Sequence, residues 1–361
     1  MPAPASLRTA CRVCATGAAL ALAGCNTVVM NPSGDIARQQ ADLITTATVL
    51  MLLITVPVIV LTLGFAWRYR ASQAQAAPQL PYEPDWDHST KLELLIWGAP
   101  LLIIIALGTV TWISTHQLDP YRKLSRLDAQ RALPADVKPL QVQAVALDWK
   151  WLFIYPEQGI ATVNELAAPV DRPIHFTITS STVMNSLFIP ALAGQIYAMP
   201  GMQTQLHAVI NRAGVYDGFS ANYSGGGFSQ MRFKFQGLEG EGFEQWVAAV
   251  RQSAARLDRA AYLKLEQPSV AHPVERYAGV DGDLFDAAVN RCVDRSKMCM
   301  GQMMAIDAAG GGGKAGLASL ARQPWRGTER TVVAGLCTTA DPQGRAALPA
   351  AAPTNALLTD L

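Results

Sequence analysis

The sequence Leu140-Gln-Val-Gln-Ala-Val-Ala-Leu-Asp-Trp-Lys-Trp-Leu-Phe-Ile-Tyr155 decides the fold of the second half of the chain. Its aromatic side chains occupy every second position, and on a β-strand such positions share one face: Trp149, Trp151, Phe153 and Tyr155. Shorter alternating runs follow over residues 173–180, 206–210 and 231–235, with Gly and Pro between them. Several short strands at this spacing predict an all-β sandwich or barrel over residues 138–237.

Two long apolar runs precede this domain. Residues 43–67 contain no charged side chain, and residues 92–115 contain only Glu93, near their start. At about 1.5 Å per helical residue, each run can cross a hydrocarbon core of about 30 Å. We therefore expect two transmembrane helices, joined by a loop over residues 68–91 with little regular structure. The composition, 50% hydrophobic and 16% charged, favours a membrane protein, and a net charge of +1 gives no electrostatic sign of nucleic-acid binding.

The N-terminus has the pattern of a secretory signal peptide over residues 1–24. Arg8 and Arg12 precede an apolar run that is too short to cross a bilayer. The ending Leu22-Ala-Gly-Cys25 resembles the bacterial lipobox, in which the cysteine is acylated and becomes the first residue of the mature protein. We therefore expect a lipid anchor at Cys25 and an outer segment over residues 25–42. Loop 68–91 would then be cytoplasmic, and the β domain would lie in the periplasm at the bacterial inner membrane.

Beyond the β domain, apolar periodicity predicts a helix over residues 244–264 and a short one over residues 283–292. We expect a helical extension over residues 238–305 and a disordered tail over residues 306–361, which are rich in Ala, Gly, Pro and Thr. Cys292 and Cys299 stand in a methionine-rich segment. In an oxidising compartment they favour a disulfide, while free thiols and a soft Cu(I) site stay open as alternatives.

Motifs along residues 20–290 resemble subunit II of the haem–copper quinol oxidases of the cytochrome bo type. The matching segments are Gly64-Phe-Ala-Trp-Arg-Tyr-Arg70, His88-Ser-Thr-Lys-Leu-Glu93, residues 148–165, Val183-Met-Asn-Ser-Leu-Phe-Ile-Pro190, Gln195-Ile-Tyr-Ala-Met199 and Gly201-Met-Gln-Thr204. The resemblance implies a two-helix transmembrane hairpin followed by a cupredoxin-like β sandwich, with C-terminal helices.

The resemblance also directs attention to a metal site. In the related cytochrome c oxidases, a binuclear copper centre uses the pattern Cys-x-x-x-Cys-x-x-x-His-x-x-Met and an upstream His, with both thiolates bridging the coppers. Here the cysteine positions hold Ser220 and Ser224, the histidine positions hold Phe228 and Asn185, and the methionine remains as Met231. A hydroxyl is a hard ligand that stays protonated near neutral pH, and a phenyl ring has no lone pair. We therefore expect no metal in this domain.

Two histidines, His175 and His207, lie on predicted strands outside the copper motif. We expect them to be surface or hydrogen-bonded residues and not ligands. The aromatic face from Trp149 to Tyr155 is likewise expected to serve packing.

The resemblance implies a non-catalytic subunit of a proton-pumping ubiquinol oxidase, which cannot accept electrons from cytochrome c. Haems and copper are expected in subunit I and no cofactor in this chain. Its partners would be subunit I, the other small subunits, membrane lipid and, through the complex, ubiquinol. Glu93 matches the carboxylate at the mouth of a proton channel, or else is simply favoured by the helix dipole. Two other functions stay open: a copper-dependent cytochrome c oxidase subunit, and a free-standing lipid-anchored cupredoxin-like binding protein.

Overall fold

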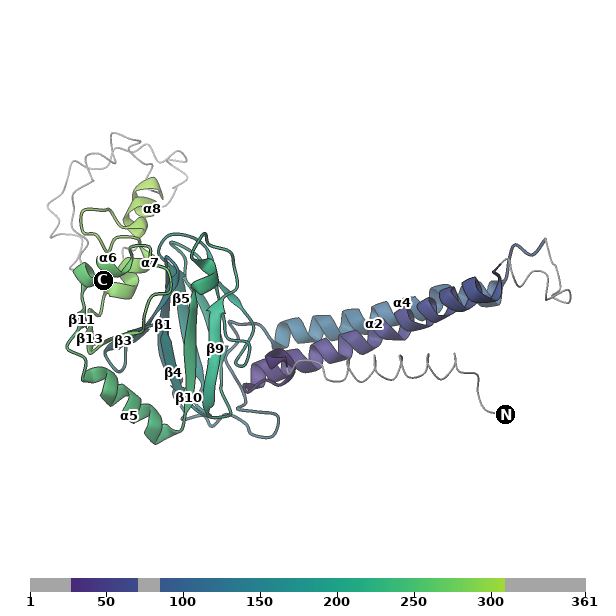
Figure 1. Cartoon of the computed structure of the whole chain (residues 1–361), viewed down its shortest axis with the longest axis horizontal. Coiled ribbons are helices and arrows are strands. Elements are labelled where there is room, and N and C mark those ends of the chain that lie inside the picture. The colour runs from purple at the N-terminus through teal and green to yellow at the C-terminus, as the bar shows by residue number, and fades with distance from the viewer. Residues whose placement is uncertain (1–26, 71–84, 309–361) are drawn as a thin grey trace, which may run out of the picture. The chain divides into compact units, whose positions relative to one another are not determined.

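The computed structural model describes residues 27–70 and 85–308 (Figure 1). These residues form two compact units. One contains the two long helices, and the other begins with Gly34–Ile36 and resumes at Asp119. The predicted signal peptide, the lipidation residue Cys25, most of loop 68–91 and residues 309–361 lie outside the described residues. Residues 306–308, predicted as part of the tail, end a helix.

The first unit contains two helices long and apolar enough to cross a membrane: α2 (Asp35–Arg68) and α4 (Thr90–Gln117). They have 34 and 28 residues, whereas about 20 apolar residues suffice for a span. Both extend beyond the predicted apolar runs, because the polar flanking residues continue the helical backbone. Pro57 and Pro100 lie inside the helices. Large apolar side chains along both helices are exposed, as suits contact with lipid or with other subunits.

The second unit is built on two β-sheets, each with mostly antiparallel pairs. Within the described residues, the first sheet has the order β12-β3-β2-β1-β5-β8: β1 (Leu140–Leu147), β2 (Lys150–Tyr155), β3 (Ile160–Val163), β5 (Ile174–Ser180), β8 (Thr204–Ala208) and β12 (Glu275–Tyr277). The second has the order β4-β10-β9-β6-β7: β4 (Glu165–Pro169), β6 (Asn185–Phe188), β7 (Ile196–Ala198), β9 (Gly214–Ser220) and β10 (Arg232–Leu238). The pairs β1/β5 and β4/β10 are parallel.

Strand β2 explains why the sheets pack face to face. Trp151, Phe153 and Tyr155 point into a core that also receives side chains from the second sheet, and Phe153 lies 4.9 Å from Phe233 between ring centroids. Alternation along a strand therefore places the aromatic face in the sandwich, as predicted. Trp149 departs from the prediction: it occupies the two-residue turn between β1 and β2 with a φ of 63°. A left-handed turn residue is not part of the strand, so its ring leaves the row.

The opposite face of β2 is also buried. Leu152 and Ile154 belong to a second core, formed with the segment that follows the sandwich. That segment contains α5 (Gly240–Arg251), β11 (Arg256–Leu257), α6 (Arg259–Leu265), β13 (Gly279–Val280), α7 (Leu284–Val289) and α8 (Met300–Ala308) (Figure 1). Strand β12 of the same segment pairs with β3, so the extension adds a strand to the first sheet.

One prediction for the extension is wrong. A single helix over residues 244–264 does not form, because α5 ends at Arg251 and a separate helix, α6, begins at Arg259. Asp258 caps α6 by accepting a hydrogen bond from the backbone amide of Ala261, at 2.7 Å. The extension over residues 238–305 contains the predicted C-terminal helices and, in addition, the short strands β11, β12 and β13. Its first helix still follows the apolar periodicity, which places Trp246 in the core between the sheets.

Charged groups connect the extension to the sandwich. Arg276 in β12 makes a bidentate ion pair with the buried carboxylate of Glu165 in β4, with N–O distances of 2.7 and 2.8 Å. Gln236 donates a further hydrogen bond to the same carboxylate. Lys150 is fully buried, and its ammonium group donates to the carbonyls of Leu265 and Gln267, both at 2.7 Å. It thus caps the end of α6, where cations are favoured, although burial lowers the pKa of Lys150.

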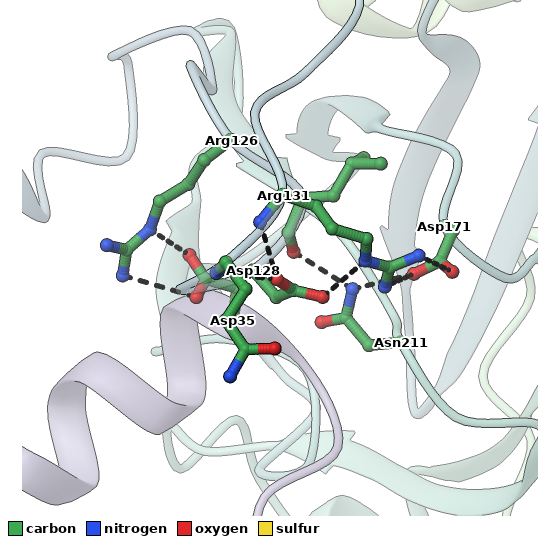
Figure 2. Close-up of polar contacts among 8 residues, drawn as sticks. Asp35, Arg126, Asp128, Arg131, Asp171 and Asn211 are labelled. Carbon is green, nitrogen blue, oxygen red and sulfur yellow. Dashed lines mark hydrogen bonds and ion pairs between the residues drawn. The ribbon is translucent and has the colours of Figure 1, made fainter.

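Within the sandwich unit, polar contacts hold Gly34–Ile36 (Figure 2). Gly34 forms an isolated antiparallel bridge with Ile210, and its amide donates to the carbonyl of Ala191. The next residue, Asp35, is 1% exposed and accepts hydrogen bonds from Arg126 at 2.9 and 3.2 Å. Residues 34–36 therefore belong structurally to the sandwich unit.

Beside this contact, Arg131 joins the connecting segment to the sandwich. Its guanidinium group contacts Asp128 at 2.6 Å and Asp171 at 2.6 and 2.8 Å (Figure 2). Asn211 completes the network by donating to Asp171 and to the carbonyl of Leu127. The connection after α4 is thus attached to two separate points of the second unit.

Candidate functional site

The five residues at copper-ligand positions lie at one end of the second sheet. Asn185 is the first residue of β6, and Ser220 is the last residue of β9, which pairs with β6. Ser224, Phe228 and Met231 follow in the loop before β10, where Phe228 begins a short 3-10 helix. We call residues 220–231 the ligand-equivalent loop. The residues picked out by the sequence pattern therefore lie on two neighbouring strands and on the loop that connects β9 to β10.

Two of these residues are hydrogen-bonded to each other. The hydroxyl of Ser220 donates to the side-chain oxygen of Asn185 at 3.1 Å, and both residues are buried. The Asn185 amide group donates to the carbonyl of Val183, and the backbone amide of Ser186 approaches the Ser220 hydroxyl. The polar side-chain atoms of Asn185 and Ser220 therefore form hydrogen bonds that join β6 to the end of β9. Such satisfaction is what burial of polar groups requires.

The other three positions have different surroundings. The Met231 side chain is fully buried in the core between the sheets. The Phe228 ring packs edge-on against Tyr223, with 5.7 Å between centroids. The Ser224 hydroxyl is buried without a hydrogen-bond partner among the residues that the structure describes. Its backbone carbonyl accepts a hydrogen bond from the indole nitrogen of Trp149, at 3.0 Å.

Trp149 is a site residue that sequence reasoning placed elsewhere. Its ring lies over the glycines of the loop: a Cβ atom added at Gly227 would overlap the ring, and one at Gly225 would be 3.3 Å away from it. Glycine is needed here because the indole approaches the backbone closely. The run Gly225-Gly-Gly227 was the available signal for such a close approach, but the sequence does not say which ring makes it.

The donor set limits what the loop can do chemically. The five copper-ligand positions offer the Asn185 carboxamide oxygen, two serine hydroxyls and one thioether, and the thioether lies in the core. Within the described ranges 27–70 and 85–308, no group of three or more His, Cys, Asp or Glu side chains could hold a metal. Soft, redox-active copper is selected by thiolate and imidazole ligands. The residues present do not fit a binuclear copper centre.

Glu93 lies in the first turn of α4, which belongs to the other unit. Its carboxylate is 2.8 Å from the Nδ1 atom of His88, and both side chains are at least half exposed. The other ring nitrogen of His88 contacts the hydroxyl of Thr90 at 3.1 Å. These contacts join the first turn of α4 to the residue that precedes its N-cap.

Cys292 and Cys299 form a disulfide in the structure, which leaves neither sulfur as a thiolate ligand. The bond closes the segment between α7 and α8, and both residues are buried. Cys11, Cys14, Cys25 and Cys337 lie outside the described residues.

Comparisons with known proteins match two family models to parts of the second unit and curated relatives to about three quarters of the chain. A family model described as "Cytochrome C oxidase subunit II, periplasmic domain" matches residues 157–237. A second, described as "COX Aromatic Rich Motif", matches residues 251–296, within the extension. A protein of Pseudomonas putida named cytochrome bo(3) ubiquinol oxidase subunit 2 is 52% identical over 272 residues, which are 75% of this chain and 82% of the relative.

The chain belongs to the ubiquinol oxidase subunit 2 family.

Other members of this ubiquinol oxidase subunit 2 family support the assignment. The protein of that name from Pseudomonas aeruginosa is 52% identical over 267 residues, covering 74% of this chain and 77% of the relative. The ubiquinol oxidase subunit 2 of Acetobacter aceti is 49% identical over 271 residues, covering 75% and 84% respectively. The predicted family and the predicted fold class, two apolar helices followed by a cupredoxin-like β domain with C-terminal helices, are thereby confirmed. As a family member, the chain is an inner-membrane protein and one subunit of a haem–copper oxidase complex.

Two histidines of this ubiquinol oxidase subunit 2 chain form an unpredicted pair. His175 in β5 and His207 in β8 are directly opposite in the register, and their rings stack with 4.5 Å between centroids. His175 is also hydrogen-bonded to Gln141, at 2.7 Å. Burial lowers the pKa of His207 to about 4, with smaller contributions from the nearby charges of His175 and Lys123.

The His207 pKa predicts loss of stability in acid. An unfolded histidine titrates near 6.5, so between about 6.5 and 4 the unfolded state binds more protons and the folded state is progressively destabilised. By pH 4 the loss is of order 2–3 kcal/mol. Replacing His207 with glutamine is expected to flatten this part of the stability profile. Thermal unfolding of the purified complex between pH 7.5 and pH 4 measures this stability profile. If the variant loses as much stability in acid as the wild type, His207 is not the cause of the loss.

Proposed function

We propose that this chain is a copper-free subunit II of a proton-pumping ubiquinol oxidase of the aerobic respiratory chain. The complex would oxidise two ubiquinol molecules and reduce one O₂ to two water molecules. Haems and copper would reside in subunit I, so this chain would be non-catalytic. It would stabilise the assembly, cover its periplasmic side and provide a proton entry point at Glu93. The relatives named ubiquinol oxidase subunit 2 support the choice of quinol as donor.

The buried hydrogen bond between Ser220 and Asn185 carries the copper-free part of the proposal. At the positions where a binuclear centre needs thiolate and imidazole, the chain has a hydroxyl and a carboxamide that bond each other. A serine hydroxyl cannot bridge two coppers as a thiolate does. Without that centre, a subunit II has no route for electrons from cytochrome c, which favours a membrane quinol as the donor.

Metal analysis and a donor assay on the native complex test this proposal. We expect the copper content to be fully accounted for by subunit I, and no copper to remain with this chain when the subunits are separated. Oxygen consumption should be supported by ubiquinol and not by reduced cytochrome c. Two coppers bound per copy of this chain, or turnover with cytochrome c alone, would overturn the assignment.

We further propose that Glu93 passes protons from the cytoplasm into subunit I. Its half-exposed carboxylate beside His88, at the start of the second span, supports this role. Replacing Glu93 with glutamine removes the titrating group but keeps its size. We expect quinol-oxidase turnover to fall by about tenfold or more, because positioned acid–base groups contribute on this scale or above.

Two control variants separate proton transfer from a merely structural role of Glu93. Glu93→Asp keeps a carboxylate and should retain most of the turnover. His88→Gln removes the imidazole beside Glu93 but leaves the carboxylate, so it should lower turnover much less than Glu93→Gln. If Glu93→Gln assembles normally and turns over at the wild-type rate, the proton-entry proposal fails.

Lipid anchoring at Cys25 and removal of residues 1–24 complete the proposal. The lipobox-like sequence Leu22-Ala-Gly-Cys25 supports them. Intact-mass measurement of the mature subunit should show a chain that begins at Cys25 and carries acyl chains. An unacylated chain that retains residues 1–24 would exclude this modification.

A further inference from the structure

The methionines that follow the disulfide are soft donors which the copper-free ligand-equivalent loop does not use. Four of them stand within seven residues: Met298, Met300, Met303 and Met304. The sulfurs of Cys292 and Cys299 are bonded to each other, so they are not available as thiolates. A thioether carries no proton and forms no disulfide, and it therefore remains a ligand in an oxidising compartment.

Three of these methionines line one cavity, of about 550 Å³, where the extension meets the end of β5. They are Met298, Met300 and Met303, and each of them is partly exposed. Met304 is 66% exposed and is not among the lining residues. The fold thus brings three thioether side chains to the wall of one space that solvent reaches.

Local structure keeps the three side chains together. Met300 and Met303 are three residues apart in α8, so they are neighbours on one face of the helix. The backbone amide of Met300 donates to the carbonyl of Asn290, just after α7. Met298 precedes Cys299, whose disulfide fixes this point of the chain to the same region.

The sulfur of Met300 is also held from the other side. A Cβ atom added at Gly201 would lie 2.5 Å from this sulfur and 2.7 Å from the terminal methyl group. The thioether therefore packs directly against the backbone of the turn between β7 and β8. Met298 and Met303 have flexible side chains, which can close on an ion beside Met300 without a change in the backbone.

The other lining groups do not favour a harder ion. Two carboxylates and two cations line the cavity, so their charges balance: Glu266, Asp294, Arg291 and Lys297. Among residues 27–70 and 85–308, no three His, Cys, Asp or Glu side chains are placed to hold a metal such as zinc. Thioethers are the donors that remain, and thioethers select Cu(I).

We propose that Met298, Met300 and Met303 bind one Cu(I) ion through their sulfurs. The ion fills a small part of the cavity, and the rest gives it a path from solvent. None of the ligand-equivalent loop lines this cavity, so the site does not depend on the quinol-oxidase proposal. A chelator empties a thioether-only site when the subunits are separated, so the copper content expected above is unchanged.

Silver tests the site on the intact oxidase complex, because Ag(I) has the same charge and softness as Cu(I) but does not change oxidation state. The complex is first washed with a Cu(I) chelator, without reductant, so that the disulfide stays closed. It is then titrated with Ag(I) in chloride-free buffer, and bound silver is measured after gel filtration. We expect the wild type to hold one Ag(I) more than a variant without the site.

Three leucine variants assign that ion to its ligands. Met298→Leu and Met303→Leu each remove one sulfur at nearly constant volume, so they should fold as the wild type does. Each should weaken this site by about 10–100-fold, the cost of losing even an outer-shell partner of a metal. Met304→Leu is the matched control in the same helix and should change nothing, because Met304 does not line the cavity.

Methionine oxidation locates the ion independently of the variants. With Ag(I) at ten times its dissociation constant, the site is free about a tenth of the time, so peroxide should oxidise Met298, Met300 and Met303 about tenfold more slowly. Peptide mass spectrometry measures each rate. Met30, which is 51% exposed and far away in the sequence, is the internal control and should be oxidised equally fast with and without silver.

The pH dependence separates thioethers from other ligands. Histidine and cysteine sites lose affinity as their ligands are protonated, whereas the affinity of this site should be equal at pH 5.5 and pH 7.5. The proposal is overturned if folded Met298→Leu and Met303→Leu bind silver as the wild type does, or if silver does not slow oxidation of the three methionines. Binding that falls in acid, or that needs a reduced disulfide, also overturns it. None of these outcomes bears on the donor assay.

Discussion

Replacing Arg276 with methionine is expected to lower the free energy of unfolding of the sandwich unit by about 3 kcal/mol. The substitution leaves the Glu165 carboxylate buried, at 5% exposure, with only the Gln236 amide among the side-chain donors described above. Removing one partner of a buried ion pair costs about 3–5 kcal/mol, since the remaining charge is uncompensated. The lower end of that range applies because the Arg276 side chain is 39% exposed.

The measurement is thermal unfolding of the purified complex, in which a loss of this size lowers the midpoint by roughly 6–12 °C for a unit of this length. Arg256→Met is the matched control. Arg256 pairs with Asp281 nearby in the extension, but its side chain is 67% exposed, so the loss should stay below about 1 kcal/mol. Equal effects of the two variants would show that the Glu165 contact is not the important one.

Replacing Gly34 with alanine is expected to destabilise the unit by about 3 kcal/mol or more. A Cβ atom at this position would lie 2.5 Å from the carbonyl oxygen of Leu192 and 2.6 Å from that of Val209. Both obstacles are backbone atoms, which cannot rotate away as a side chain does. The bridge to Ile210 would open, and the ion pair of the next residue with Arg126 would be displaced.

Protease sensitivity of the segment that precedes α2 checks this prediction, together with the unfolding temperature of the complex. Gly240→Ala is the control, because Gly240 begins helix α5 and a Cβ atom added there would meet no described atom within 4 Å. This substitution should be neutral or slightly stabilising. If Gly34→Ala behaves like Gly240→Ala, residues 34–36 are not held as tightly as their contacts indicate.

The β architecture was predictable where apolar and polar residues alternate over a long run. The prediction failed where the backbone turns. The row of aromatic residues in β2 and the runs in β5, β8 and β10 indicated a sandwich, because period-two burial is visible along the chain. Trp149 satisfied the same alternation but adopts a left-handed φ in a tight turn. Alternation alone does not reveal where a hairpin reverses, so the first ring of the predicted row became part of the loop contact.

The extension was less predictable because its structure depends on the sandwich. The strand β12 has three residues, too few for a periodic signal, and it exists because β3 has a free edge to pair with. The break between α5 and α6 depends on the cap at Asp258, whose signal competes with continuous apolar spacing across residues 244–264. The His175–His207 stack likewise joins residues far apart in sequence that only strand register brings together.

The candidate site was predicted as a set of positions and not as a geometry. Sequence spacing indicated which residues stand where copper ligands would be. It did not reveal that Asn185 and Ser220 bond each other, since that depends on the pairing of β6 with β9. It also gave no sign that Trp149 would hold the glycines of the loop.

The strand β2 has a consequence for how this subunit can change in evolution. With Trp151, Phe153 and Tyr155 on one face and Leu152 and Ile154 on the other, it has no side that water can wet. Deleting the extension would therefore expose an apolar surface on the sandwich. A sandwich that acquires an extension must already have an apolar surface at this place. The sandwich and the extension therefore cannot be gained or lost independently of each other. A relative that lacks the extension should carry polar residues in place of Leu152 and Ile154. The residue types at these two positions should therefore show from sequence alone whether the extension is present.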